Sequence, residues 1–286
     1  MTKQEIQSII DITDQKKKEE AEQKYSELLE KEIIQRTIVG IDVYRYSKMD
    51  KIPQSLLPYC LDILIEGTFA NLLEYEPAFF SKELNKESND AIIHTGDGFY
   101  VPFIDPIRAT LFCIYFQSNL SSINTLNNQI LMRSMVGSIS IRYAMTIGPV
   151  YYYENKLYGK PIIQNARLLS LDKLNRFLLS NKVFLWFEIH TNGIETIGAI
   201  KLEDIKKIDK FTLFSDKSLI FVPEQVGFYR FRTLILQKIG DQKVKDDTED
   251  IYSLFIQVLM KHKMRIEIDK YVISIGNLNT HGIVEK

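Results

Sequence analysis

The chain has 286 residues, of which 45% are hydrophobic and 26% are charged, and its formal net charge is −1. This length and composition are those of an ordinary globular protein with a substantial core. A net charge so close to zero gives no general electrostatic attraction to nucleic acid or to an anionic membrane, so we predict no nucleic-acid binding.

Membrane insertion and secretion are not predicted either. No apolar run approaches the roughly 18 residues that a membrane-spanning helix needs. The N-terminus is polar and charged, unlike a signal peptide. Cys60 and Cys113 lie in apolar, helix-like segments, which favours buried thiols in a reducing compartment. We therefore expect a cytoplasmic protein without a membrane span.

Residues 1–35 are predicted to form a helical extension. Its apolar side chains follow helical spacing in a narrow stripe made of Tyr25, Leu28, Leu29 and Ile33. A stripe this narrow needs a partner, which is either the main domain or a second subunit.

The predicted main domain covers residues 36–222 and opens with a β-branched strand over Thr37–Asp42. A helix from about Pro53 to Leu73 follows. A hairpin is then predicted around Asp97, because short β-prone runs flank a turn that contains two glycines. An Asp at such a turn is either a simple turn residue or a side chain free to reach a metal ion.

A helix and a long strand are predicted next. Asp105 is a suitable N-cap with Pro106 at the first helical position, and this helix is expected to end near Ile123. Apolar and polar residues alternate over Ile139–Ile147, which predicts a strand. Gly148-Pro149 is expected to break this strand.

The chain is then expected to return as a strand over Val150–Tyr153 and to continue as a helix over Pro161–Leu171. The resulting order, β-α-β-β-α-β-β-α, predicts an α+β fold in which helices pack on an antiparallel-rich sheet.

The remainder is harder to interpret, and residues 223–286 are taken as a C-terminal extension of mixed structure. Thr248 is a candidate cap for a helix that carries Ile251, Leu254, Phe255, Val258 and Leu259. Further strands are expected at Phe177–Leu179, Ile194–Ile197, Thr212–Phe214 and Leu219–Val222.

Two aspartates in strand-like contexts are the strongest functional signal. Asp42 ends an apolar strand, where a carboxylate is costly to bury unless it is paired or binds a cation. Together with Asp97 it suits a site for two divalent cations that hold a triphosphate, since Mg²⁺ and Mn²⁺ prefer carboxylate and phosphate oxygens. The alternative for Asp42 is a strand-end residue that caps the following helix.

Four segments in this order resemble the class III nucleotide cyclase homology domain, known from adenylate and guanylate cyclases. They span about residues 36 to 170. The resembling segments are Ile41–Ser47, Thr95–Phe99, Arg142–Val150 and Gly159–Arg167. The resemblance implies a ferredoxin-like α+β domain that cyclises a nucleoside triphosphate.

The departures from the family pattern concern base recognition. Purine-selecting members carry a Lys where this chain has Ile93, an Asp where it has Lys156, and an Asn where it has Ile163. The chain is therefore either inactive or reads another base, and retention of both aspartates and Arg167 favours the second reading. Within the family it most resembles the pyrimidine cyclases of Pycsar antiphage defence, where larger residues follow the metal-binding Asp, as Tyr44-Arg45 does here.

The resemblance implies a mechanism with two Mn²⁺ or Mg²⁺ ions as cofactors. Asp42, Asp97 and the backbone carbonyl of Val43 would bind the ions, and Arg167, contributed by the opposite protomer of a homodimer with composite active sites, would stabilise charge on the α-phosphate. The alternative for Arg167 is a surface salt bridge. The nucleotide would contact residues at the two motifs: Tyr44, Arg45, Tyr46, Ser47 and Ile93.

The expected reaction is conversion of UTP, or CTP, to the 3′,5′-cyclic monophosphate, a messenger for a separate cyclic-nucleotide-sensing effector. The alternative to nucleotide contact for Tyr44 and Arg45 is that both residues only cover the start of the following helix. A purine cyclase and a catalytically silent nucleotide-binding or dimerising module are the competing functions. A diguanylate cyclase would need a Gly-Gly-Asp/Glu-Glu-Phe hairpin, which Thr95–Phe99 does not supply.

Overall fold

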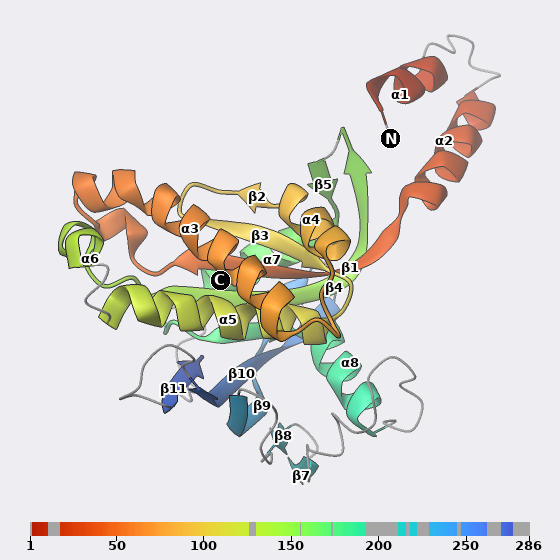
Figure 1. Cartoon of the computed structure of the whole chain (residues 1–286). Coiled ribbons are helices and arrows are strands. Elements are labelled where there is room, and N and C mark those ends of the chain that lie inside the picture. The colour runs from red at the N-terminus through yellow and green to blue at the C-terminus, as the bar shows by residue number, and fades with distance from the viewer. Residues whose placement is uncertain are drawn as a thin grey trace.

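The computed structural model describes residues 2–10, 18–125, 130–154, 156–172, 174–192, 211–215, 218–221, 229–244, 247–261 and 270–276. Helices pack on a largely antiparallel sheet whose strands run in the order β2-β3-β1-β4-β6-β10-β9-β8-β7 (Figure 1). The predicted α+β class is confirmed.

The three strands at the site are antiparallel neighbours. The strand β1 (Ile34–Val43) lies between β3 (Gly98–Phe103) and β4 (Ile141–Tyr153). The short strand β2 (Ile93–His94) pairs with β3 and completes the predicted hairpin. Alternate residues of β1 are buried on opposite faces, as the period of two in its side chains requires.

Helices cover both faces of this part of the sheet. On one face lie α3 (Lys51–Tyr75) and α5 (Pro106–Thr125), close to their predicted bounds. Asp105 caps α5 as predicted, because its carboxylate accepts from the Arg108 amide at 2.8 Å. The helix α7 (Lys160–Leu171) covers the other face of β1 and β4.

A glycine and an asparagine bring α7 unusually close to the sheet. The fully buried amide of Asn165 donates to the carbonyls of Ile38 at 2.8 Å and Ala144 at 3.1 Å. A Cβ at Gly40 would lie only 2.0 Å from Asn165 Oδ1, so only glycine leaves room at this place. The position of α7, and of Arg167 on it, is therefore fixed against β1 and β4.

The predicted break at Gly148-Pro149 is wrong, since β4 continues through it to Tyr153. Gly148 makes room for the ring of Pro161, whose Cγ would lie 2.9 Å from an added Cβ. Pro149 is tolerated because β6 (Phe177–Ser180) pairs only with Tyr143–Met145, so one edge of β4 lacks this neighbour beyond them.

The predicted helix after Thr248 is also wrong, because Asp247–Lys261 forms the strand β10. This strand pairs with β6 on one side and with β9 (Tyr229–Val244) on the other. Its buried side chains at Tyr252, Leu254, Ile256 and Val258 alternate toward the α3–α5 face. Hydrogen bonds to three neighbouring strands, β6, β9 and β11 (Lys270–Ile275), and this alternation outweigh the helical spacing.

Other described elements add to the sheet or lie around it. The predicted strands at Phe177–Leu179, Thr212–Phe214 and Leu219–Val222 are found as β6, β7 and β8, with Val222 outside the described residues, as is Ile194–Ile197. The remaining elements are α1 (Lys3–Ile10), α2 (Lys18–Glu32), the 3₁₀ helix Tyr46–Lys48, α4 (Lys82–Asp90), α6 (Ile130–Val136), β5 (Lys156–Tyr158), α8 (Asn181–Asn192), β7 (Phe211–Ser215), β8 (Ser218–Phe221) and β11 (Lys270–Ile275).

The two ends of the chain relate differently to the sheet. The helices α1 and α2 lie beyond the β4–β5 hairpin (Figure 1), within the segment predicted to be helical. By contrast, β9 and β10 continue the sheet that starts with β1. The boundaries at residues 35 and 222 stay predictions.

Both cysteines are buried and free, as expected. Among the described helices, α3 is long and apolar enough to cross a membrane by composition alone. Eight of its residues are buried in the protein. The apolar ones among them belong to the same core cluster as residues of α5 and the sheet, as in a core helix.

Candidate active site

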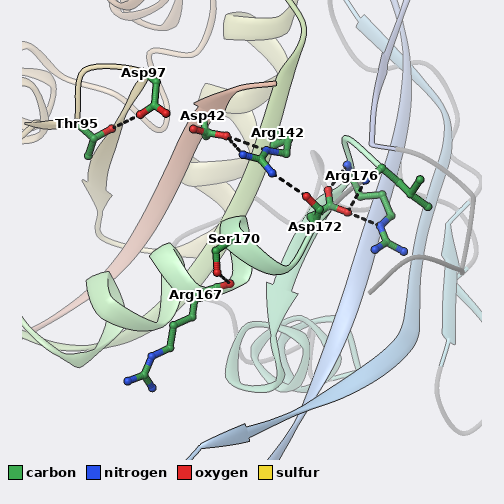
Figure 2. A network of polar contacts seen from close by, with 9 residues as sticks. Asp42, Thr95, Asp97, Arg142, Arg167, Ser170, Asp172 and Arg176 are labelled. Carbon is green, nitrogen blue, oxygen red and sulfur yellow. Dashed lines mark hydrogen bonds and ion pairs between the residues drawn. The ribbon is translucent and has the colours of Figure 1, made fainter. Parts of the chain in front are cut away.

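The structure brings Asp42 and Asp97 together at one end of the central strands (Figure 2). In the β1–β3 ladder Asp42 lies opposite Gly98. Gly98 directly follows Asp97 in the chain. The amide of Val43 donates to the backbone carbonyl of Asp97 at 2.8 Å. Two carboxylates that are 55 positions apart in the sequence thus share one site.

The turn that carries Asp97 depends on both glycines. Gly96 has φ +93°, which favours glycine. A Cβ at Gly98 would lie 2.0 Å from the carbonyl oxygen of Ile41, so glycine is needed for β1 and β3 to approach here. Thr95 closes the turn through its amide, which donates to the Gly98 carbonyl at 2.9 Å, and its hydroxyl lies 3.4 Å from Asp97 Oδ1.

Burial and a like charge act on Asp42. Its side chain is only 13% exposed, and burial raises its pKa above the ordinary value. The hydrogen bond and charge of Arg142 act in the opposite direction, while neighbouring Asp97 raises the pKa further. Burial also raises the pKa of Tyr100, with smaller contributions from the charges of Asp42 and Asp97. The site therefore concentrates negative charge that a cation would neutralise.

Arg142 is a site residue that the sequence analysis did not assign. It stands opposite Asp42 in the β1–β4 ladder. Its Nε donates to Asp42 Oδ2 at 2.8 Å, its Nη2 donates to the same oxygen, and its Nη1 donates to the carbonyl of Asp172 at 2.7 Å. The available signal was a charged residue within the alternating strand Ile139–Ile147.

The donor set fits hard divalent cations. Within the described ranges no group of three or more His, Cys, Asp and Glu side chains gathers. A pair of carboxylates is nevertheless the typical protein share of a Mg²⁺ or Mn²⁺ site, because substrate phosphates and water supply the other oxygens. Asp42 and Asp97, with the nearby backbone of Val43, are the residues that would hold such ions.

The loop after β1 places the predicted nucleotide contacts beside the aspartates. Tyr44 is half-buried, with the guanidinium of Arg45 5.0 Å and that of Arg142 5.9 Å from its ring centroid. Arg45 is exposed and has φ +62°, a left-handed backbone that is uncommon for a non-glycine residue. Tyr46 packs against the core, whereas Ser47 is exposed.

The other predicted residues lie along the α7 face. Arg167 is exposed on α7, and Figure 2 shows its side chain directed away from Asp42 and Asp97. Ile163, one turn earlier, is 56% exposed. Ile93 is half-buried in the apolar cluster with Ile38 and Val150. Within one chain the structure therefore unites the two aspartates but not Arg167 with them.

No protein-family model matches the sequence, and no curated protein matches it as a relative. Nucleotide cyclases are among the solved structures to which the fold is similar. An adenylate/guanylate cyclase/hydrolase from Silicibacter pomeroyi is 16% identical, with 78% of this chain and 97% of that chain covered and a TM-score of 0.40. The adenylyl cyclase CyaB from P. aeruginosa is 13% identical over 78% and 95%, with a TM-score of 0.41.

A dimeric guanylyl cyclase domain of the RhoGC fusion protein from the aquatic fungus Blastocladiella emersonii is 14% identical over 78% of this chain and 97% of that chain, with a TM-score of 0.40. Likenesses at these scores carry no functional argument, which rests on the residues of the site.

Proposed function

We propose that this protein is a nucleotide cyclase, which converts a ribonucleoside triphosphate to its 3′,5′-cyclic monophosphate and pyrophosphate. The observation that carries the proposal is the convergence of Asp42 and Asp97 at the ends of paired strands, where burial and mutual repulsion call for a cation. Tyr44 and Arg45 adjoin this pair on the loop that a nucleotide would meet.

The chemistry follows from the donors. Divalent ions bound there would lower the pKa of the ribose 3′-hydroxyl and neutralise charge on the triphosphate. The carboxylates of Asp42 and Asp97 and the carbonyl of Val43 would hold these ions in place. The guanidinium of Arg167 would donate two hydrogen bonds to the α-phosphate, where charge develops as the 3′-oxygen attacks and pyrophosphate leaves.

The direction of Arg167 supports a dimeric catalytic unit. Its side chain points away from the aspartates of its own chain and is exposed (Figure 2). An arginine so placed can serve the aspartates of a second copy. We therefore propose a head-to-tail homodimer with two composite sites, each with aspartates from one protomer and Arg167 from the other.

The proposed substrate is a pyrimidine nucleotide, UTP or CTP, with UTP preferred. Half-buried Ile93 offers no hydrogen bond, and Lys156 is exposed on β5. The chain thus lacks, at these two positions, the Lys and the Asp with which purine-selecting cyclases contact the base. The cyclic product would act in the cytoplasm on a separate effector, in antiphage defence.

The test is incubation of purified protein with each of the four ribonucleoside triphosphates and Mn²⁺, with cyclic product and pyrophosphate measured by mass spectrometry. We expect cyclic product, fastest from UTP or CTP. A purine at the top of the ranking overturns the substrate proposal. No cyclic product from any nucleotide, with Mn²⁺ or Mg²⁺, overturns the enzyme proposal in favour of a silent module.

A further inference from the structure

A line of polar contacts joins Asp42 to the segment that follows α7 (Figure 2). Arg142 lies in the middle of this line. Two of its nitrogens, Nε and Nη2, donate to Oδ2 of Asp42, and its third, Nη1, donates to the backbone carbonyl of Asp172 at 2.7 Å. One guanidinium thus connects the candidate ion site with the end of α7.

A buried ion pair holds the Asp172 carbonyl in place. The side chains of Asp172 and Arg176 are 1% and 0% exposed, and Arg176 Nε donates to Asp172 Oδ1 at 2.9 Å. The same carboxylate accepts from the Arg176 amide at 2.5 Å and from the Leu174 amide at 3.2 Å. Burial of both side chains and three hydrogen bonds to the Asp172 carboxylate hold this turn in one arrangement.

The arrangement of Arg142 on Asp42 is unusual for its chemistry. An arginine often binds a carboxylate in a bidentate manner, with one guanidinium nitrogen donating to each oxygen. Here both contacts go to Oδ2, and the remaining nitrogen donates to the Asp172 carbonyl, which fixes the place of the guanidinium beside the carboxylate. Both contacts of the guanidinium thus go to the other oxygen than Oδ1, and Asp42 lies between Arg142 and Asp97 (Figure 2).

We propose that Asp172 and Arg176 are positioning residues for the Asp42 carboxylate and act through Arg142. They hold Arg142 to one side, so that Oδ1 of Asp42 stays available to a divalent cation. If the turn moved, Arg142 would be free to form the bidentate contact with both oxygens, and its charge would then compete with the cation. This inference rests on the proposed function, in which Asp42 binds metal.

Binding of Mn²⁺ to the purified full-length protein, measured by electron paramagnetic resonance of free Mn²⁺, tests the inference without any turnover. Arg176→Lys keeps a charge beside Asp172 but loses the planar geometry, and Arg176→Met removes the charge. We expect Mn²⁺ to bind about tenfold more weakly to either variant, as when outer partners of metal ligands are changed. If Arg176→Met does not fold, Asp172→Asn breaks the same pair.

A matched control separates this role from general stability. Leu72 is fully buried on α3, on the other face of the sheet. Leu72→Ala should lower the thermal midpoint and leave the Mn²⁺ affinity unchanged. Circular dichroism establishes that each variant is folded at the temperature of the binding measurement.

The decisive measurement repeats the Arg176 changes in an Arg142→Gln background. Glutamine carries no charge and cannot form a charged bidentate contact with the Asp42 carboxylate. In this background Arg176→Lys should therefore change the Mn²⁺ affinity less than about twofold. An equal loss in both backgrounds would overturn the inference, because the effect would not pass through Arg142.

The proposed function fails in a different way. Unchanged Mn²⁺ binding by Asp97→Asn would remove the ion site from these aspartates and overturn both proposals. Weakened binding by Asp97→Asn, combined with wild-type binding by all the Arg176 and Asp172 variants, would overturn only the positioning role.

Discussion

Asp42 and Arg142 occupy opposite places in the β1–β4 ladder, and both guanidinium contacts go to a single carboxylate oxygen, Oδ2. Arg142 opposes the rise in pKa that burial imposes on this carboxylate at a strand end, while the other oxygen faces the turn that carries Asp97. The apolar strand β1 can carry this acidic side chain because its partner, Arg142, comes from a distant part of the sequence.

Replacement of Asp97 should remove activity and preserve the fold. Asp97→Asn keeps the size of the side chain but halves the paired negative charge, so cyclic product from any nucleotide should fall by at least about a hundredfold. Asp97 lies on a partly exposed turn, so the thermal midpoint should change little. Wild-type turnover in this variant would be incompatible with the metal assignment.

Complementation tests the composite site. Asp97→Asn and Arg167→Ala should each be inactive alone. After subunit exchange, half of the dimers are mixed and each has one intact site of two, so about a quarter of wild-type activity should return. Absence of recovery, with exchange demonstrated by differently tagged chains, would place Arg167 outside the partner's site.

The strand end at Gly98 should be far less tolerant than the turn at Gly96. Gly98→Ala would place a methyl group 2.0 Å from a backbone oxygen of Ile41, which cannot move without separating β1 from β3. We expect a loss of more than about 2 kcal/mol of unfolding free energy, together with activity. Gly96→Ala meets no atom within 4 Å and costs only the strain of its positive φ, about 1 kcal/mol. Equal midpoints in urea would contradict this difference.

The sequence predicted the elements around the site well because their signals are local. The alternation over Ile139–Ile147 and the glycines beside Asp97 each specify a strand or a turn without help from distant residues. The stretch after Thr248 is predicted to be helical because its apolar residues fit helical spacing as well as a strand, and only pairing with β6, β9 and β11 selects the strand.

The contacts inside the site were less predictable for a related reason. Arg142 meets Asp42 across 100 residues, and Arg176 is linked to the site through Asp172, whose backbone carbonyl accepts from Arg142. Such contacts depend on the register of strands and on where a helix ends, which residue types alone do not specify. The sequence shows a charged residue, Arg142, within a predicted strand, but it does not show that Asp42 is its partner.

The two thiols should be unreactive in the folded protein. Cys60 and Cys113 are fully buried, and burial raises the pKa of each thiol, most strongly for Cys113. Because only the thiolate reacts readily, Ellman's reagent at pH 8 should label neither residue until denaturant is added, and then both. Rapid labelling without denaturant would contradict the packing of α3 against α5.

Base preference should follow the two positions that depart from the purine-reading pattern. Ile93 gives no hydrogen bond and Lys156 reverses the charge found in purine-selecting cyclases. A site that hydrogen-bonds a base rejects analogues that leave its polar groups unpaired. The double variant Ile93→Lys/Lys156→Asp should therefore raise kcat/KM for ATP or GTP relative to UTP by at least about tenfold. The Lys156→Ala variant, which adds no purine-reading group, serves as the control. An unchanged ranking of the four nucleotides in the double variant would show that base choice is made elsewhere, with Tyr44 and Arg45 the next residues to change.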